Sequence, residues 1–377
     1  RVVDGIGGGG KYAKISDAVT AALAGDTIDV LNGTYNETAT ISISKRVVLK
    51  GAGYTTGGTI LTTSVTIDPA ADNAKVFGFR FNGAAVLIEA GAENILIADN
   101  YFSGLSGSVT INSSAGDTIR NNIFKVPLNG VGIATQYNIT LSNITINNNI
   151  FDGEGSTSNS NGLYLQAQLA NSSNIRIYNN FFGDLTRAFN NDWSAFGSWI
   201  ITGNMFVRLS AVSVSAVPAM LYSGNWTYNM PVSYTDLTNG SANGTGNPGF
   251  KRFDQTKGFV YAESLATDSD LRLADASTPF PSSPVDGSYQ PISPMFSSYV
   301  DVQQQPGSGN TNRPDIGIFG GPYPFKSPFV ASTIPIVSSV TVKSKKTGAS
   351  SVGPKDIIQV NVTGSFGGGQ QEQKTDH

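Results

Sequence analysis

The residues able to carry out acid, base or nucleophilic chemistry form a restricted set in this chain. The sequence has no cysteine and a single histidine, His377, which ends a Gly/Gln-rich tail where order is not expected. Thiolate metal sites, cysteine nucleophiles, histidine-ligated zinc and imidazole-dependent triads are therefore excluded. Any catalytic acid or base must be Asp, Glu, Lys, Arg or Tyr.

Polar and aromatic side chains alternate with apolar ones in two segments, 162–166 (GLYLQ) and 188–192 (AFNND). With a period of two, Leu163 and Phe189 point to one face of a sheet and their neighbours to the other. The outward face then carries Tyr164, Gln166, Asn190 and Asp192. Amides and carboxylates bind sugar hydroxyl groups, and aromatic faces stack on pyranose rings. The spacing therefore predicts an outward patch of side-chain types suited to saccharides.

Three residues in or beside these segments either extend this outward patch or stabilise the fold. Trp193 and Trp199 supply further aromatic surface, or alternatively fasten the long loop in which they lie. Arg187 is included among the binding residues, although an ion pair with Asp184 or Asp192 is its simpler role.

A catalytic assignment needs more than this patch. A glycosidase uses two carboxyl groups about 5 to 10 Å apart, and Asp192 has no carboxylate on the adjacent outward positions. Asp152, Glu154 or Asp184 would have to approach it through the loops. A polysaccharide lyase needs a base and often Ca²⁺, but the loop 152–161 (DGEGSTSNSN) lacks the regular ligand spacing of a calcium site. The catalytic residues stay unassigned; no cofactor or metal is expected, and Ca²⁺ stays an open alternative.

One short pattern recurs along the chain: alternating apolar residues, then Asn, one residue, and an aromatic. It occurs as NILIADNYF, DTIRNNIF, NITINNNIF, NIRIYNNFF and SWIITGNMF, with VFGFRF as an earlier member. The aromatic positions are Phe81, Phe102, Phe124, Phe151, Phe182 and Phe206. A repeat every 21 to 31 residues with period-two alternation and no helical stripe predicts a β-solenoid of short parallel strands. We expect the rings to stack about 4.8 Å apart.

The asparagines of this repeat are interpreted as structural rather than as ligands. They are Asn100, Asn122, Asn149, Asn180 and Asn204. Asn tolerates the left-handed backbone of a tight turn, and identical amides stacked about 4.8 Å apart hydrogen-bond in a ladder. In the strands that follow the aromatics, the same alternation places Val109 and Val131 inward and Gly132 and Ala134 outward.

The N-terminal part carries a capping helix and a family resemblance. Ile15, Val19 and Ala22 share one face of a short helix over 16–24, which would cover the open end of the first coil. This segment, ISDAVTAALAGDTIDVLNGTYNE followed by ISISKRVVLKGAG, resembles the opening of right-handed parallel β-helix proteins of the pectate-lyase-like superfamily. The coils from about 74 to 229 resemble its repeats, and DSDLRL, SSPVDG and RPDIGIFGGPYP resemble the closing segment of bacterial surface β-helix proteins.

The resemblance implies an all-β, right-handed parallel β-helix, with a saccharide groove on the outer face in carbohydrate-acting members. Lyases, hydrolases, esterases and adhesins share this fold, so it implies no single activity.

Towards the C-terminus, the coil repeat ends and a different residue pattern begins. We predict a β-helix domain over 1–327, a β appendage over 328–366 and a disordered tail over 367–377. The segments IPIVSSVTVKS and DIIQVNV are two alternating strands that resemble the start of an immunoglobulin-like module.

Composition limits the partners. The net charge is −3 and only 14% of residues are charged, against about a quarter in typical domains, so no basic surface is available for nucleic acid. No apolar run approaches the about 18 residues of a membrane span. The chain opens at Arg1 with no signal peptide, which we interpret as a mature or trimmed form.

We therefore predict a secreted bacterial protein, extracellular or on the cell surface, that binds a polysaccharide or another glycan in a carbohydrate-binding, adhesive or structural role. A polysaccharide lyase or glycoside hydrolase acting in the same groove is the alternative. A surface partner or self-assembly stays open.

Overall fold

A computed structural model describes residues 1–3, 12–55, 57–104, 107–137, 139–153, 159–165, 172–191, 199–210, 220–228, 244–245, 250–252, 270–273, 317, 336–344, 358–365 and 371–376. The chain divides into two compact units, Arg1–Lys326 and Ser327–His377. Among the helices in the described ranges, none is long and apolar enough to span a membrane.

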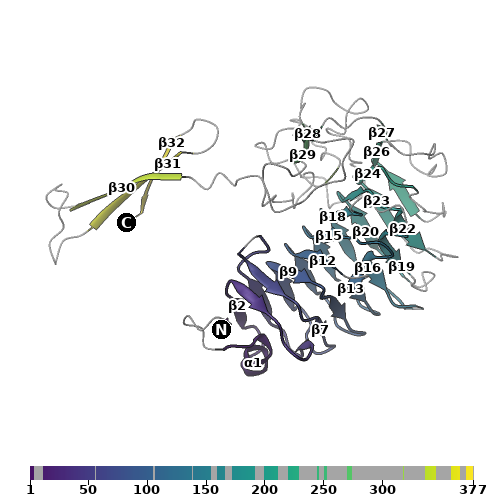
Figure 1. Cartoon of the computed structure of the whole chain (residues 1–377), viewed down its shortest axis with the longest axis horizontal. Coiled ribbons are helices and arrows are strands. Elements are labelled where there is room, and N and C mark those ends of the chain that lie inside the picture. The colour runs from purple at the N-terminus through teal and green to yellow at the C-terminus, as the bar shows by residue number, and fades with distance from the viewer. Residues whose placement is uncertain are drawn as a thin grey trace. The chain divides into compact units, whose positions relative to one another are not determined.

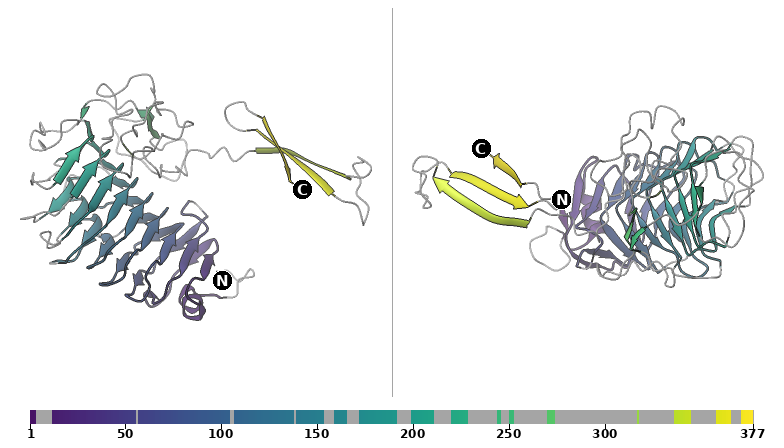
Figure 2. Two further views of the ribbon diagram at one scale, coloured as in Figure 1. Left: turned by 180° about the vertical axis from the view of Figure 1, so that it is seen from behind. Right: turned by 90° about the horizontal axis from the view of Figure 1, so that it is seen from above.

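The first unit contains a stack of coils whose strands line up in three parallel sheets of 10, 10 and 7 described strands (Figures 1 and 2). Sheet 1 consists of β1 (Val2–Val3), β2 (Thr27–Val30), β5 (Val48–Gly51), β8 (Lys75–Phe77), β11 (Leu96–Ala98), β14 (Thr118–Arg120), β17 (Thr145–Asn147), β20 (Ile175–Tyr178), β23 (Trp199–Thr202) and β25 (Met220–Ser223). Sheet 2 consists of β3 (Gly33–Tyr35), β6 (Thr59–Leu61), β9 (Phe79–Asn82), β12 (Tyr101–Ser103), β15 (Ile123–Lys125), β18 (Ile150–Asp152), β21 (Phe181–Gly183), β24 (Met205–Val207), β26 (Trp226–Tyr228) and β27 (Gly244–Thr245). Sheet 3 consists of β4 (Ile41–Ile43), β7 (Val65–Ile67), β10 (Val86–Ile88), β13 (Gly107–Ile111), β16 (Val131–Thr135), β19 (Asn161–Leu165) and β22 (Arg187–Asn191). The predicted parallel β-helix is confirmed, and it is the architecture that the resemblance to the pectate-lyase-like superfamily implies.

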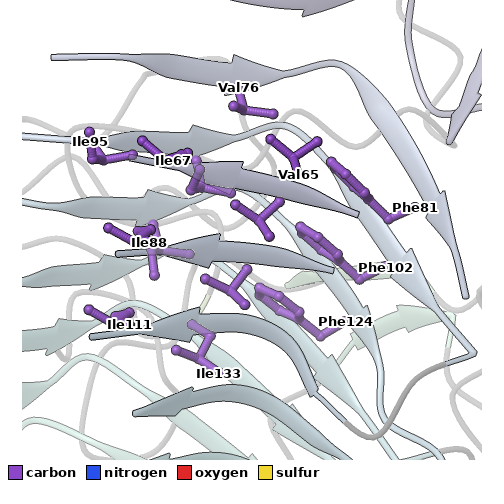
Figure 3. Close-up of a cluster of buried hydrophobic side chains, with 14 of the residues drawn as sticks. Val65, Ile67, Val76, Phe81, Ile88, Ile95, Phe102, Ile111, Phe124 and Ile133 are labelled. Atoms are coloured by element: carbon purple, nitrogen blue, oxygen red, sulfur yellow. The ribbon is translucent and has the colours of Figure 1, made fainter. Parts of the chain in front are cut away.

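The aromatic residues of the repeat form one column in the core. The ring centroids of Phe81, Phe102, Phe124, Phe151 and Phe182 follow one another at 4.7, 5.0, 4.8 and 4.7 Å, with planes within 7° of parallel. Figure 3 shows the first three rings of this column beside rows of valine and isoleucine from the neighbouring strands. The predicted stacking is confirmed, because the parallel register repeats each side chain once per coil.

The predicted asparagine ladder is also present. From Asn100 to Asn225, each Nδ2 donates to the Oδ1 of the next asparagine at 3.0 to 3.1 Å. All of these side chains are fully buried. The left-handed backbone, however, belongs to the residue before each ladder asparagine, such as Asn121 and Asn179. Amide hydrogen bonding therefore requires asparagine at the ladder positions, whereas the left-handed backbone favours Asn, Asp or Gly at the position before each of them.

The predicted capping helix is α1 (Ile15–Ala21), in which Ile15, Ala18 and Val19 are buried. Its N-cap residue makes no side-chain hydrogen bond. Instead, the carboxylate of Glu37 accepts from the backbone N–H groups of Ile15 and Ser16, the former at 2.6 Å. At the other end, the ammonium group of Lys45 donates to the carbonyls of Thr20 and Ala22. Two side chains of the solenoid thus satisfy both ends of the helix with the charges that its dipole favours.

Antiparallel strands occur later in the chain. In the first unit, β28 (Phe250–Arg252) pairs with β29 (Asp270–Leu273). The second unit contains β30 (Ile336–Ser344), β31 (Ile358–Ser365) and β32 (Gln371–Asp376) in one antiparallel sheet. Strand β32 lies in the tail for which composition predicts disorder. The likeness of this unit to an immunoglobulin-like module stays a prediction.

Candidate functional site

The outer face of sheet 3 brings two of the predicted binding residues together. Tyr164 of β19 is in register with Asn190 of β22, so their side chains leave neighbouring strands at the same height, about 5 Å apart. Both are partly exposed, whereas the alternating residues Leu163, Leu165 and Phe189 are buried. The strands β16, β19 and β22 follow one another in Figure 1. We call the set of Asn161, Tyr164, Arg187 and Asn190 the sheet 3 patch.

Arg187 belongs to this patch through Asn190. Its Nη1 donates to the Oδ1 of Asn190 at 3.4 Å. Of its two anticipated ion-pair partners, Asp184 pairs with Arg208 at 2.6 Å, and Asp192 lies outside the described residues. A partly exposed guanidinium and an amide thus lie beside the ring of Tyr164 on one sheet face.

Asn161 is a polar residue of the patch that the sequence analysis missed. It is in register with Arg187 on the neighbouring strand and is only 7% exposed. Its Nδ2 donates to the carbonyl of Asn159 at 3.1 Å, but its Oδ1 is buried and has no hydrogen-bond partner in the structure as described. A buried acceptor without a donor is costly, but because this oxygen is closed to solvent, a bound molecule could reach it only after the side chain moves.

The strands of sheet 3 begin with a departure from simple alternation. Val131, predicted to point inward, is partly exposed, and Gly132, predicted to point outward, is buried. Both expectations are wrong because Gly132 lies against the aromatic column. A Cβ there would come within 2.6 Å of the Phe151 ring, and Gly162 stands in the same relation to Phe182. These glycines bring the strand close to the core just before Ile133 and Leu163, from which the regular alternation continues.

The nearby carboxylates are held in ion pairs inside the protein. Asp152 is fully buried and its Oδ2 lies 2.5 Å from the Nζ of Lys125. Asp184, paired with Arg208, is 9% exposed. Neither is placed to act as an acid on the outer face of sheet 3. In the described part of the chain, no group of three or more His, Cys, Asp or Glu residues could hold a metal ion.

The aromatic residues around the patch differ from expectation. Trp199 is 1% exposed and lies in β23, in register with Ile175, so it is a core residue and offers no surface to a sugar. Tyr137, two residues beyond the end of β16, is 76% exposed. Tyr137 is not among the residues predicted to bind a saccharide. The predicted residues Gln166, Asp192 and Trp193, and the alternative acid Glu154, lie outside the described residues.

No protein-family model and no curated protein matches this sequence. Among solved structures, the chain is similar to a pectin methylesterase variant in complex with a hexasaccharide, at 12% identity and a TM-score of 0.28, over 62% of this chain and 93% of the other. It is also similar to pectate lyase Pel9A, at 12% identity and a TM-score of 0.35, over 81% of this chain and 90% of the other. At these values neither protein's activity nor any residue role is carried over to this chain.

Proposed function

We propose that this chain binds a polysaccharide or another glycan on the outer face of sheet 3, at the sheet 3 patch. The observation that carries the proposal is the register of Tyr164 with Asn190, which sets a partly exposed aromatic ring beside an amide on a rigid sheet. An aromatic face and an amide are the two groups that a pyranose ring and its hydroxyl groups require. The guanidinium of Arg187, held to Asn190, adds donors for hydroxyl or carboxylate oxygens.

Binding without cleavage is the form of the proposal that the described residues favour. Asp152 and Asp184 neutralise Lys125 and Arg208 inside the protein, so their carboxylates serve the fold. A polysaccharide lyase or glycoside hydrolase stays as the second candidate, because Asp192 follows β22 directly, two residues after Asn190. The proposal places the protein outside the cell or on its surface, in an adhesive or structural role, where polysaccharides are encountered.

A screen of immobilised glycans combined with a depolymerisation assay on the same sample separates the candidates. We expect binding to at least one glycan class, with neither new reducing ends nor the ultraviolet absorbance of an unsaturated lyase product. Product formation would establish the enzyme instead. An absence of binding to every polysaccharide tested would contradict both.

A further inference from the structure

The outer face of sheet 2 is apolar and buried, although it points away from the core. On the strands from β12 to β26, the residue before the position in register with the phenylalanine column leaves the opposite side of the strand. In coil order these residues are Tyr101, Ile123, Ile150, Phe181, Met205 and Trp226, which are in register with one another. Their exposure is between 0% and 7%, yet none belongs to the continuous core cluster inside the coils. We call this set the outer row of sheet 2.

The burial of the outer row begins at a definite coil. Ile60 and Arg80 occupy the same row in β6 and β9, and both are partly exposed. From Tyr101 onwards the row is closed to solvent. Side chains of sheets 1 and 3 cannot close it, because the coil lies between them and this face. Tyr101 is covered by the coils themselves, because the ring of Tyr54 stacks on it at 6.2 Å and the guanidinium of Arg80 lies 4.9 Å from its ring centroid. The rest of the row, from Ile123 to Trp226, needs a cover from outside the coils.

Gly317 shows where the distal part of the chain meets this face. Its N–H donates to the carbonyl of Gly203 at 2.7 Å, and its carbonyl accepts from the Nδ2 of Asn179 at 3.1 Å. Asn179 lies 138 residues earlier in the sequence. A Cβ at position 317 would lie 3.3 Å from the Cε of Met205, a member of the outer row. Gly317 itself is buried.

Position 317 favours glycine through its backbone conformation, because its φ of +103° is one that residues with a Cβ rarely adopt. An added Cβ would also lie 3.3 Å from the Cε of Met205, so the end of that side chain would have to shift slightly. Gly317 is therefore held through both of its main-chain polar groups, and it packs closely against Met205.

We infer that the outer row of sheet 2 is a docking surface for this chain's own distal polypeptide, and that Gly317 is the anchor by which that polypeptide straps the coils around Asn179 and Met205. The occupant is this chain and not a second copy, because Gly317 is already seated on Asn179, Gly203 and Met205. This inference does not depend on the proposed saccharide site, which lies on sheet 3.

Oxidation of Met205 in the full chain tests the strap. Hydrogen peroxide transfers one oxygen atom to an accessible thioether and leaves water, and the Met205 peptide is followed by mass spectrometry. Asn179→Gly removes the donor to Gly317 while suiting the left-handed φ of 53° at that position. We expect Met205 in this variant to oxidise several-fold faster than in the unmodified chain, with an unchanged far-ultraviolet circular dichroism spectrum.

Two matched controls keep the result decisive. Asn121→Gly makes the same change in the same left-handed row two coils earlier, and Met205 should stay protected. For the anchor itself, Gly317→Ala is compared with Gly53→Ala, which has a φ of +123° and no atom within 4 Å of the added Cβ. Only Gly317→Ala should accelerate oxidation. Equal rates in Asn179→Gly and Asn121→Gly, or protection of Met205 in both Asn179→Gly and Gly317→Ala, would overturn the inference.

Discussion

A single carboxyl group in the core makes the stability of the solenoid depend on pH. The residues that precede Leu96, Thr118, Thr145 and Arg176, which are in register on β11, β14, β17 and β20, are all buried, and in coil order they are Ile95, Asp117, Ile144 and Ile175. An aspartate thus occupies a row of isoleucines and is fully buried. Its Oδ1 accepts from the N–H of Ile95 at 2.9 Å and its Oδ2 from the hydroxyl of Ser114 at 2.5 Å.

The charged groups near Asp117 do not stabilise its negative charge. Glu93 and Asp72 are both carboxylates and disfavour its ionised form. Burial, as the largest cause, together with these charges raises the pKa of Asp117 to about 7, against the lowering effect of the two hydrogen bonds. The folded state therefore holds a proton that the unfolded chain, with a pKa of about 3.9, releases.

The sign and size of the effect follow from this difference. The contribution of Asp117 to stability is greatest below about pH 4 and is lost as the pH rises through about 7. Over about three pH units, at about 1.4 kcal/mol per unit, the full loss is about 4 kcal/mol, of which about 2 to 3 kcal/mol falls between pH 5 and pH 8.

Asp117→Asn isolates this contribution. The amide keeps an acceptor for Ile95 and gains a donor for the Ser114 hydroxyl, but it does not titrate. In urea unfolding at pH 5 and pH 8, we expect the unmodified chain to lose about 2 to 3 kcal/mol more than the variant on going to the higher pH. Asp29→Asn, at a partly exposed carboxylate, is the control and should retain the dependence. If Asp117→Asn retains it as well, the reasoning is refuted.

Two further predictions concern the interior. Phe151→Ala removes a ring stacked at 4.8 and 4.7 Å between two others and should lower the free energy of unfolding by about 3 to 5 kcal/mol in urea titrations; a loss below about 1 kcal/mol would mean that the column is not a continuous core. Lys125→Met leaves the buried Asp152 without its ion-pair partner and should cost about 3 to 5 kcal/mol at neutral pH, whereas adding Asp152→Leu should recover most of that loss. Equal stability of the single and double variants would show that the buried charge is not the cause.

The coils were predictable because their signal repeats. One asparagine and one phenylalanine return in each of the five coils from Asn100 to Phe206, so Phe124 and Asn122 are fixed by a repeated pattern and not by local preference. The covered outer face of sheet 2 was also readable: Ile123 and Ile150 stand between a ladder asparagine and a core phenylalanine, and apolar residues on both sides of a parallel strand indicate burial on both faces. That signal was overlooked.

Features that occur once were not predictable. Asp117 stands seven residues before Phe124, as Ile95 does before Phe102, so its place in the row could be seen in the repeat, but its raised pKa depends on burial and on the carboxylates of Glu93 and Asp72. The inward position of Gly132 depends on the ring of Phe151 in the following coil. The partnerless oxygen of Asn161 and the pairing of Asp184 with Arg208 likewise arise from contacts between coils. Alternation did place Tyr164 and Asn190 on one face, because both lie beyond the irregular start of their strands.

Calorimetric titration of a glycan identified in the screen, against the Tyr164→Ala variant, tests the central claim most directly. Thr110→Ala is the matched control, because Thr110 lies in the same outward row of sheet 3, separated from Tyr164 by Ala134. Loss of one aromatic stacking surface should weaken binding by about tenfold in Tyr164→Ala and leave Thr110→Ala unchanged, with unfolding midpoints close to that of the unmodified chain. Unaltered affinity in Tyr164→Ala would contradict a saccharide site on this face.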